Sequence, residues 1–354
     1  MNTGRRIAVV LMNLGGPDSL QAVRPFLVNL FNDPAILELP QPLRWLLAQL
    51  IARRREKPAR ENYAKIGGAS PLLANTRAQA QALEAALSGE GETKVFTAMR
   101  YWHPMTEETA RAVASFDPHA IVLLPLYPQF SGTTSGSSLR RWREAAGAAG
   151  IDVSTHAVCC YPDEPGFVAA AAQAIDTALR QAKLSGAPRL LLSAHGLPQK
   201  TVDRGDPYQH QVERSAAAII EALKRRDPAW SELDHVVCYQ SRVGPLTWLQ
   251  PYTDAEIVRA ARDRRAIALF PIAFVSEHSE TLVELDIDYR RLAEAERAPA
   301  YVRVPTVGTE AAFIDGLANL VRAAVRRPPA IPSAAGARIC PAGLARCAMQ
   351  AVAP

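Results

Sequence analysis

The sequence lacks several features that would assign it to a class at once. None of its apolar runs approaches the roughly 20 residues that a membrane-spanning helix needs. Only five cysteines occur among 354 residues. They form no regular disulfide framework in a chain of this length, and their odd number argues against full pairing, which favours a reducing cytoplasm. The G-x-G-x-x-G fingerprint of dinucleotide sites and the lysine-bearing phosphate loop of nucleotide triphosphate sites are also absent. These absences argue against integral membrane proteins, disulfide-rich secreted proteins and common nucleotide-binding enzymes.

Positive charge is in slight excess but is hardly concentrated. The formal net charge is +5, and the arginine clusters at 53–55 and 264–265 are short and carry no interleaved aromatic residues. Nucleic acid is therefore not the expected partner, whereas a small anionic molecule would suit the excess charge. The N-terminal basic and apolar residues imitate a signal peptide, but a Gly-Gly-Pro turn at 15–17 follows without a cleavage site. We interpret residues 6–14 as a first buried strand.

What the sequence does contain is an alternation of strand and helix patterns. Strands are expected at 6–14, 94–100, 119–126, 153–160, 189–194, 234–239, 266–275 and 301–304, and helices at 75–88, 105–116, 137–147, 165–183 and 308–326. Strands linked through helices build parallel sheets. We predict an α/β protein of two doubly wound, Rossmann-like domains, 1–160 and 161–327, followed by a flexible Pro- and Ala-rich tail at 328–354. No sequence repeat relates the halves, so this duplication rests on element order alone.

Two helices near the N-terminus carry further expectations. Asp18 and Gln21 have capping-box spacing, which predicts a helix starting directly after the glycine turn. Residues 43–51 have an apolar face that ends at the three arginines. This segment is either a helix packed on the core, with its basic end favoured by the helix dipole, or part of a lid at 31–55 that touches a membrane surface.

Polar groups follow two of the predicted strands of the second half. The run 266–275 stops at His278 and Glu280, and the strand 189–194 stops at His195. Ligands bind at the carboxyl ends of strands in open parallel sheets. Glu280, Glu284 and Asp288 are spaced so that a helix would align them in one stripe, which is either a cation path or a solvated acidic face. An imidazole with carboxylates accepts protons near neutral pH and binds a divalent cation loosely, but is too small a set for a structural zinc site.

The first half also presents polar and aromatic residues at a strand end. Arg100 and Tyr101, followed by Trp102, would suit a flat anionic ligand, although Trp102 is equally a core residue. The Ser/Thr/Gly loop at 130–139 opens a helix whose N-terminus could bind an anion.

Several short motifs, collinear from about residue 6 to 325, together resemble the ferrochelatase family. They are NLGGP at 13–17, KIGGASP at 65–71, RYWHP at 100–104, LYPQFS at 126–131, SAHGLP at 193–198, YQSRVGP at 239–245 and FVSEHSETL at 274–282. The resemblance implies chelatase-like domains with a porphyrin cleft between them. It also implies insertion of ferrous iron into protoporphyrin IX, the last step of haem synthesis.

The resemblance places roles on particular residues. The family's catalytic histidine falls on His195 and its paired carboxylate on Glu280, with His278 beside them. Iron enters only after two pyrrole protons leave, so a base is needed, and a ring held near its transition geometry exposes the nitrogens. Glu280 is either a proton relay or a metal ligand, and Glu284 and Asp288 would extend a path for the metal ion.

Further residues match substrate contacts of the family. The positions that line the porphyrin pocket or contact its propionates are Leu14, Arg55, Tyr63, Ser70, Arg100, Tyr101 and Trp248. Hydroxyl and basic groups beside apolar ones suit two carboxylates on an apolar disc. The match around Arg55 is loose, because the neighbouring proline spacing differs.

Some family members hold a two-iron two-sulfur cluster on three cysteines near the C-terminus and one in the loop after the Tyr-Pro-Gln motif. Here Cys340 and Cys347 remain, whereas Gly343 and Gly132 stand at the other positions. Two ligands cannot hold such a cluster, so we expect none and no other tightly bound cofactor. The adjacent cysteines at 159 and 160 could substitute, but they lie in an expected strand and are more simply core residues.

The expected partners are the porphyrin and ferrous iron, bound by a cytoplasmic monomer or homodimer with peripheral membrane contact. Two alternatives stay open. One is a chelatase for another tetrapyrrole or metal, such as coproporphyrin III or cobalt, and the other is a non-catalytic haem or metal carrier on the same scaffold.

Overall fold

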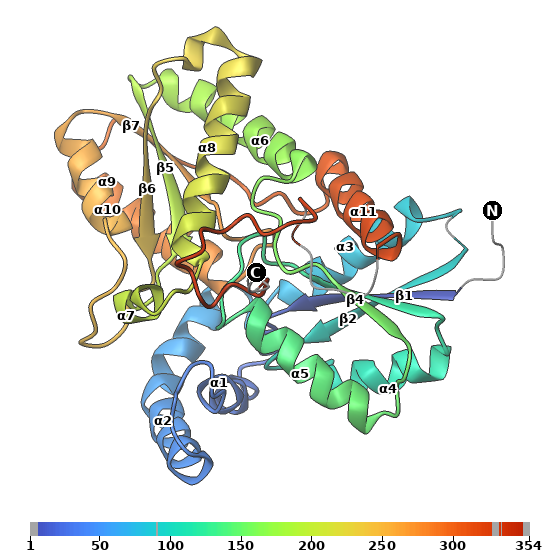
Figure 1. Cartoon of the computed structure of the whole chain (residues 1–354). Coiled ribbons are helices and arrows are strands. Elements are labelled where there is room, and N and C mark those ends of the chain that lie inside the picture. Colours follow the sequence, from blue (N-terminus) through green and yellow to red (C-terminus); the bar gives the residue numbers. More distant parts are fainter. Residues whose placement is uncertain (1–5, 90, 328–332, 334, 350–354) are drawn as a thin grey trace. The chain divides into compact units, whose positions relative to one another are not determined.

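The computed structural model describes residues 6–89, 91–327, 333 and 335–349. The chain forms two compact units, the first made of residues 1–160 and 317–338 and the second of 161–316 and 339–354. The first division falls after residue 160. The C-terminal part is shared differently from the expectation, because 317–327 clusters with the first unit. The division between residues 316 and 317 falls within helix α11 (Ala311–Val325), which is labelled in Figure 1.

A four-stranded parallel sheet in the order β2-β1-β3-β4 forms the centre of the first unit. Its strands are β1 (Arg6–Asn13), β2 (Glu92–Met99), β3 (Ala120–Pro125) and β4 (Ser154–Ala157). Its flanking helices are α1 (Val23–Phe31), α2 (Gln41–Lys65), α3 (Leu72–Ala86), α4 (Thr106–Phe116) and α5 (Ser135–Ala148). β3 is buried along its whole length and β1 over all but its first residue, which is why both read as continuous apolar runs.

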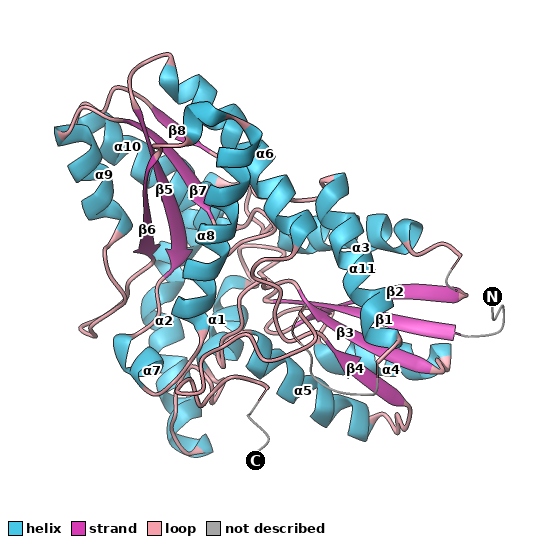
Figure 2. Ribbon diagram, turned by 45° about the horizontal axis from the view of Figure 1, so that its top comes forward, coloured by secondary structure: helices cyan, strands magenta, loops and turns pink. Residues whose placement is uncertain are grey.

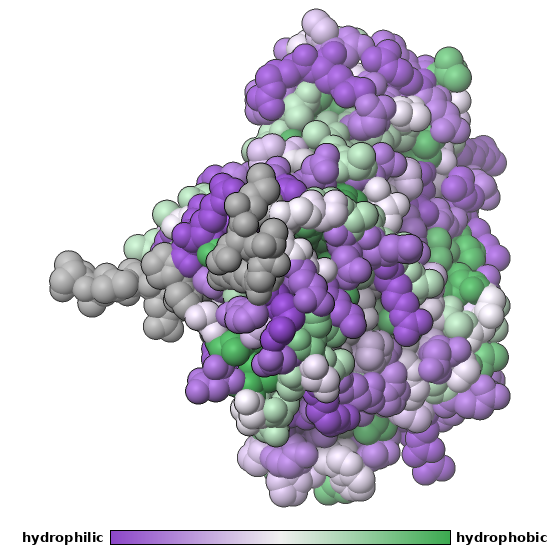
Figure 3. Space-filling view, turned by 90° about the vertical axis from the view of Figure 1, so that its right-hand side faces the viewer, coloured by the Kyte–Doolittle hydropathy of each residue, from purple (hydrophilic) through white to green (hydrophobic). Residues whose placement is uncertain are grey.

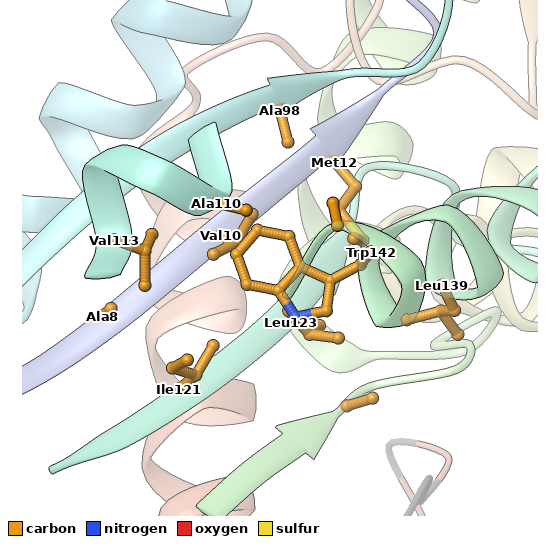
Figure 4. Packing of buried hydrophobic residues seen from close by; sticks show 12 residues of the cluster. Ala8, Val10, Met12, Ala98, Ala110, Val113, Ile121, Leu123, Leu139 and Trp142 are labelled. Carbon is orange, nitrogen blue, oxygen red and sulfur yellow. The ribbon is translucent and has the colours of Figure 1, made fainter. Parts of the chain in front are cut away.

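A cluster of buried apolar side chains on one face of this sheet has Trp142 at its centre. Trp142 of α5 is 2% exposed and lies over the small and branched side chains of β1 and β3, among them Val10 and Leu123 (Figure 4). Ala110 and Val113 of α4 pack against the same cluster. This packing fixes α4 and α5 on the sheet, whose strands end next to the polar loops.

The second unit repeats the arrangement with the strand order β6-β5-β7-β8, again all parallel. Its strands are β5 (Pro188–His195), β6 (Asp234–Gln240), β7 (Ala266–Pro271) and β8 (Tyr301–Arg303). Its helices are α6 (Pro165–Lys183), α7 (Gln199–Asp203), α8 (Tyr208–Arg226), η1 (Pro228–Trp230), α9 (Thr253–Arg262), η2 (Glu280–Asp288) and α10 (Tyr289–Ala295). α6 and α8 cover one face of the sheet, and α9 and α10 the other (Figure 2). Both units are therefore doubly wound α/β sheets, as predicted.

The first helix starts later than expected. α1 begins at Val23, and Ala22 stands at its N-cap without a side-chain hydrogen bond, so the Asp18 capping box is not formed. The reason is Pro25, which lacks a backbone N–H and is tolerated only in the first turn of a helix. A helix starting at Asp18 would have placed this proline in its interior.

The apolar face at the start of α2 is exposed. The exposed fractions are 58% for Leu43, 47% for Trp45, 58% for Leu46 and 46% for Leu50. The interpretation of this segment as a helix packed on the core is therefore wrong for its first turns, whereas Ala48 on the opposite side is fully buried. These side chains form the largest group of exposed apolar residues on one described helix. Figure 3 shows the hydropathy of another face, where apolar and polar residues are mixed.

The chain after β7 departs from the expected regular elements. β7 ends at Pro271, earlier than the predicted 275, because proline cannot donate to a further ladder bond. The segment after His278 is not an ordinary α-helix but the π-helix η2, and the amide of Tyr289 still reaches back five residues to the carbonyl of Glu284. π-Helical turns are rare and occur frequently at functional sites.

Part of the predicted tail is held by contacts in the second unit. The backbone N–H of Arg346 donates to the Gly205 carbonyl at 3.1 Å, and Gln211 Nε2 donates to Cys340 Sγ at 3.1 Å. Cys340 and Cys347 are 6% and 5% exposed. The expectation of a loose tail therefore needs correction for 339–349, while 328–332, 334 and 350–354 lie outside the described residues. Within the described chain, no helix is long and apolar enough to cross a membrane.

Candidate active site

The second unit brings His195 and Glu280 together. His195 ends β5, next to the centre of the sheet, and Glu280 opens η2 after the β7 loop. His195 Nε2 lies 3.6 Å from Glu280 Oε2, and the two side chains are 36% and 33% exposed. His195 Nδ1 lies 2.6 Å from the Gly196 carbonyl oxygen, which can only accept, so Nδ1 carries the ring proton in the neutral form. The lone pair of Nε2 is then available on the side of the carboxylate.

Glu280 also presents an atom that can accept a proton. Its Oε2 is buried, yet finds no hydrogen-bond partner among the described residues. A buried acceptor without a donor is costly unless a proton or a cation satisfies it. Within the described part of the chain, no group of three or more His, Cys, Asp or Glu side chains could hold a metal ion. The pair thus offers two acceptor atoms, His195 Nε2 and Glu280 Oε2, to a proton or a metal ion.

His278 is buried and contacts the backbone of Glu280. The ring is 8% exposed, and its Nδ1 accepts a hydrogen bond from the Glu280 backbone N–H at 3.0 Å. The Phe274 ring stands edge-on to it, with centroids 4.4 Å apart. Burial lowers the pKa of His278, against the opposing charges of Glu280 and Glu277. His278 therefore stays neutral at physiological pH and fixes the backbone at Glu280.

Glu284 is tied down, in contrast to Glu280. Its Oε1 accepts from the Ser241 backbone N–H and from the Tyr289 hydroxyl, each at 2.9 Å, and Ser241 Oγ donates to Oε2. Burial raises the pKa of Glu284, and the charge of Glu280 adds to the effect. The predicted acidic stripe is therefore uneven: Glu280 is open, Glu284 is held by neighbours, and Asp288 ends the π-helix.

Trp248 lies beside the same strand end. It forms a backbone bridge with Pro198, and a Cβ placed on Gly196 would come within 3.2 Å of its ring and 2.9 Å of the Gln240 carbonyl. Only glycine fits between the indole and the strand. The SAHGLP motif thus places a flat apolar ring next to His195.

Sequence reasoning missed two groups near this pair. Tyr208 at the start of α8 is 6% exposed, and burial together with the charge of Glu280 raises the pKa of its hydroxyl. Ser241, which holds Glu284, has a left-handed backbone with φ of 63°. An aromatic residue at a helix start gives no pattern that marks it, and the bonding of Ser241 depends on a contact made 43 residues away.

In the first unit, Arg100 and Tyr101 converge on a residue that the sequence did not single out. Arg100 Nη2 and the Tyr101 hydroxyl each lie 2.7 Å from Asp33 Oδ2, and Ser137 Oγ donates to the same oxygen. Burial pushes the pKa of Asp33 upward, but the Arg100 charge and these hydrogen bonds outweigh it, so the pKa is lowered. Tyr101 is 1% exposed, which leaves its ring no surface for a ligand. Its expected role as a substrate contact stays a prediction, and Arg100 is ion-paired with Asp33 rather than a free cation.

Arg100 nevertheless borders a pocket of about 420 Å³ within the first unit. Its other charged lining residues are Asp33, Arg44, Arg140, Arg141 and Glu144. Arginines outnumber carboxylates in this lining, so its field favours an anion.

The remaining predicted contacts also belong to the first unit. Ser70 lies against the glycine turn, where a Cβ on Gly16 would come within 2.4 Å of Ser70 Oγ and 3.9 Å of the Tyr63 hydroxyl. Tyr63 is 7% exposed, and Leu14 packs against the same cluster. The guanidinium of Arg55 stands 5.7 Å from the Phe31 ring centroid. The structure thus brings Tyr63 and Ser70 together beside the first strand end.

Comparison with known proteins adds to this geometry. The model of the ferrochelatase family matches residues 6–325. The ferrochelatase of Caulobacter vibrioides is 51% identical over 346 residues, covering 97% of each chain, and that of Phenylobacterium zucineum is 51% identical over 348 residues, covering 98% of each. Among solved structures, the sirohydrochlorin chelatase of Bacillus subtilis in complex with cobalt aligns with a TM-score of 0.52 at 10% identity, over 92% of this chain and 97% of that one, a likeness of fold alone. With strand-end motifs, two doubly wound units and full-length relatives in agreement, the chain belongs to the ferrochelatase family.

Proposed function

We propose that the protein inserts ferrous iron into protoporphyrin IX, the terminal step of haem synthesis, with His195 and Glu280 as its reacting groups. Beyond family membership, one observation carries the assignment. The free Nε2 of His195 faces a carboxylate oxygen of Glu280 that lacks a donor, 3.6 Å away. A porphyrin must release two N–H protons before a metal ion can enter, and this pair supplies acceptors for them.

In the proposed mechanism, His195 takes a pyrrole proton at Nε2 while its Nδ1–H stays on the Gly196 carbonyl. The imidazolium is stabilised by the adjacent Glu280 carboxylate, which passes the proton on or contacts the metal ion with the same oxygen. Trp248, beside Gly196, offers an apolar face against which a flat macrocycle can rest. His278 keeps the Glu280 backbone in place through its Nδ1.

The porphyrin contacts are proposed on the family match. Leu14 would line the macrocycle, Tyr63 and Ser70 would bind propionate groups from beside the glycine turn, and Arg55 would add a cation from α2. Arg100 would attract the propionate carboxylates of the porphyrin through the positive field of the pocket that it borders, because its guanidinium is already paired with Asp33.

Metal insertion by purified protein separates an enzyme from a carrier. Zinc is used beside ferrous iron, because zinc-porphyrin formation is read directly by fluorescence. His195→Ala should lower kcat by roughly 10² to 10⁴, as expected for a lost general base, while porphyrin binding is retained. His235→Ala is the matched control: this histidine is exposed at the start of β6, and its Nδ1 likewise meets a backbone carbonyl, at 2.8 Å. Normal turnover in His195→Ala, or binding without insertion by the wild type, would refute the proposal.

The choice of substrate is tested by competition. Protoporphyrin IX and coproporphyrin III differ in the number of carboxylates, so both are offered together to the wild-type enzyme with iron, and with cobalt in a second series. The proposal requires the larger kcat/KM for protoporphyrin IX and iron.

A peripheral contact with an anionic membrane is part of the proposal. The exposed apolar side chains at the start of α2 precede the arginines at 53–55 on the same helix. Apolar insertion with adjacent cations favours acidic lipid, and a surface location would suit a hydrophobic substrate and product. The proposal includes no iron–sulfur cluster, because glycine stands at 132 and 343.

A further inference from the structure

The reacting pair depends on a stretch of unusual backbone. Both His278 and Glu280 lie between the end of β7 and the body of η2, whose wide turns are less favourable than those of an α-helix. A change in the winding of η2 would rotate Glu280 relative to His195. Tertiary contacts must therefore hold this segment at both of its ends.

Arg303, the last residue of β8, makes both contacts. Its Nη1 lies 2.5 Å from Glu277 Oε1, immediately before His278. Its Nε and Nη2 donate to the two oxygens of Asp286 within η2, at 2.9 and 2.8 Å. The Arg303 side chain is 11% exposed, so these bonds are shielded from water. A bidentate guanidinium–carboxylate pair fixes orientation as well as distance.

Thr306 and Tyr301, which flank Arg303 in the chain, also bond to this segment. The Thr306 backbone N–H donates to Glu277 Oε1 at 2.9 Å, so that one oxygen receives two donors. The Tyr301 hydroxyl donates to the Leu285 carbonyl inside η2 at 2.7 Å, and Tyr301 starts the same short strand. β8 and the residues after it thus hold the segment before His278 and the C-terminal half of η2.

We infer that Arg303 is a positioning residue for metal insertion: by joining Glu277 to Asp286 it sets the winding of η2 and the place of Glu280 opposite His195. The inference rests on the proposed roles of His195 and Glu280. Arg303 does not touch the reacting groups, so its effect passes through the backbone of residues 277–286.

Arg189, another buried and ion-paired arginine of the same unit, serves as the matched control with a purely structural role. Arg189 at the start of β5 has a side chain 6% exposed and pairs with Asp234 and Asp263, each at 2.8 Å. It stands at the opposite end of the sheet from the strand end that carries His195. Its loss should destabilise the unit without displacing Glu280.

The experiment measures kcat, porphyrin KM and melting temperature for the whole protein, with zinc and ferrous iron as metals. Misplacing a catalytic group by about 1 Å can cost 10²-fold, so Arg303→Met should lower kcat roughly 10- to 100-fold with porphyrin KM within about twofold of the wild type. Arg303→Lys keeps the charge but not the fork and should recover only part of kcat. Asp286→Asn should lower kcat as well, and combining it with Arg303→Met should add little.

Arg189→Met controls for loss of stability, and should lower the melting temperature while kcat stays within about twofold. The inference is overturned if Arg303→Lys and Asp286→Asn both keep wild-type kcat, or if Arg303→Met loses no more kcat than Arg189→Met at equal loss of stability. The lysine and asparagine variants decide the matter if Arg303→Met does not fold. Failure of the wild type to insert any metal would instead refute the proposed function.

Discussion

Replacing Asp33 with Asn should destabilise the first unit strongly. The Asp33 side chain has no exposed surface, and that of Arg100 is 15% exposed. Asparagine has nearly the volume of aspartate, so no cavity opens and the loss is electrostatic. Removing one partner of a buried pair costs about 3–5 kcal/mol, and we expect about 3 kcal/mol because Arg100 borders a pocket and its side chain is 15% exposed.

The assay is urea unfolding at pH 7, with amide hydrogen exchange in β1 and β5 reading the two units separately. Only the unit of β1 should lose stability. Asp117→Asn is the control, because Asp117 pairs with Arg6 at the surface with its own side chain 84% exposed, and loss of that pair should cost less than about 1 kcal/mol. Asparagine also tolerates the left-handed φ of 51° at this position.

Acid provides an independent check on Asp33. Its pKa is lowered in the folded protein, so its contribution is complete above the usual aspartate value of about 3.9 and is lost as the pH falls through the folded value. The difference between wild type and Asp33→Asn should therefore be full at pH 7 and shrink below about pH 4. A difference under about 1 kcal/mol at pH 7, or one that acid leaves unchanged, would refute this reasoning.

Further predictions concern the two glutamates, the membrane contact and the cysteines of the tail. Glu280→Gln should reduce kcat by at least about 10²-fold, since it removes the open acceptor. Glu284→Gln, whose oxygens are already bonded, should have a smaller and metal-dependent effect, and equal mild losses in both variants would indicate a solvated acidic face. Sedimentation with acidic liposomes should be lost when Trp45 and Leu46 are made polar, and unchanged binding would exclude this surface. Anaerobically purified protein should lack acid-labile sulfide, and stoichiometric sulfide would require ligands beyond the two tail cysteines.

The elements that could be predicted from sequence are those with a local cause. β3 and β5 were recognisable because parallel strands covered on both faces carry continuous apolar runs, and His195 stands out because it comes soon after such a run. The start of α1 was missed because Pro25 overrides the Asp18 capping signal. Both outcomes follow from residues adjacent in the chain.

The parts that could not be predicted depend on contacts between distant residues. The bond from Ser241 to Glu284 and that from Arg100 to Asp33 join residues 43 and 67 positions apart. No spacing rule relates such pairs, so the sequence could suggest that Arg100 is functional but not that Asp33 neutralises it. The π-helical winding of η2 likewise depends on tertiary contacts, among them those of Arg303.

The assignment of most of α11 to the first unit has a consequence for biosynthesis. Arg322 of this helix donates to the Ala86 carbonyl at the end of α3, at 2.7 Å, and residues 317–338 belong to the first unit. Because a ribosome delivers the chain from its N-terminus, residues 1–160 emerge long before the helix that completes them. The position that α11 occupies beside α3 therefore stays empty until nearly the whole polypeptide has been synthesised.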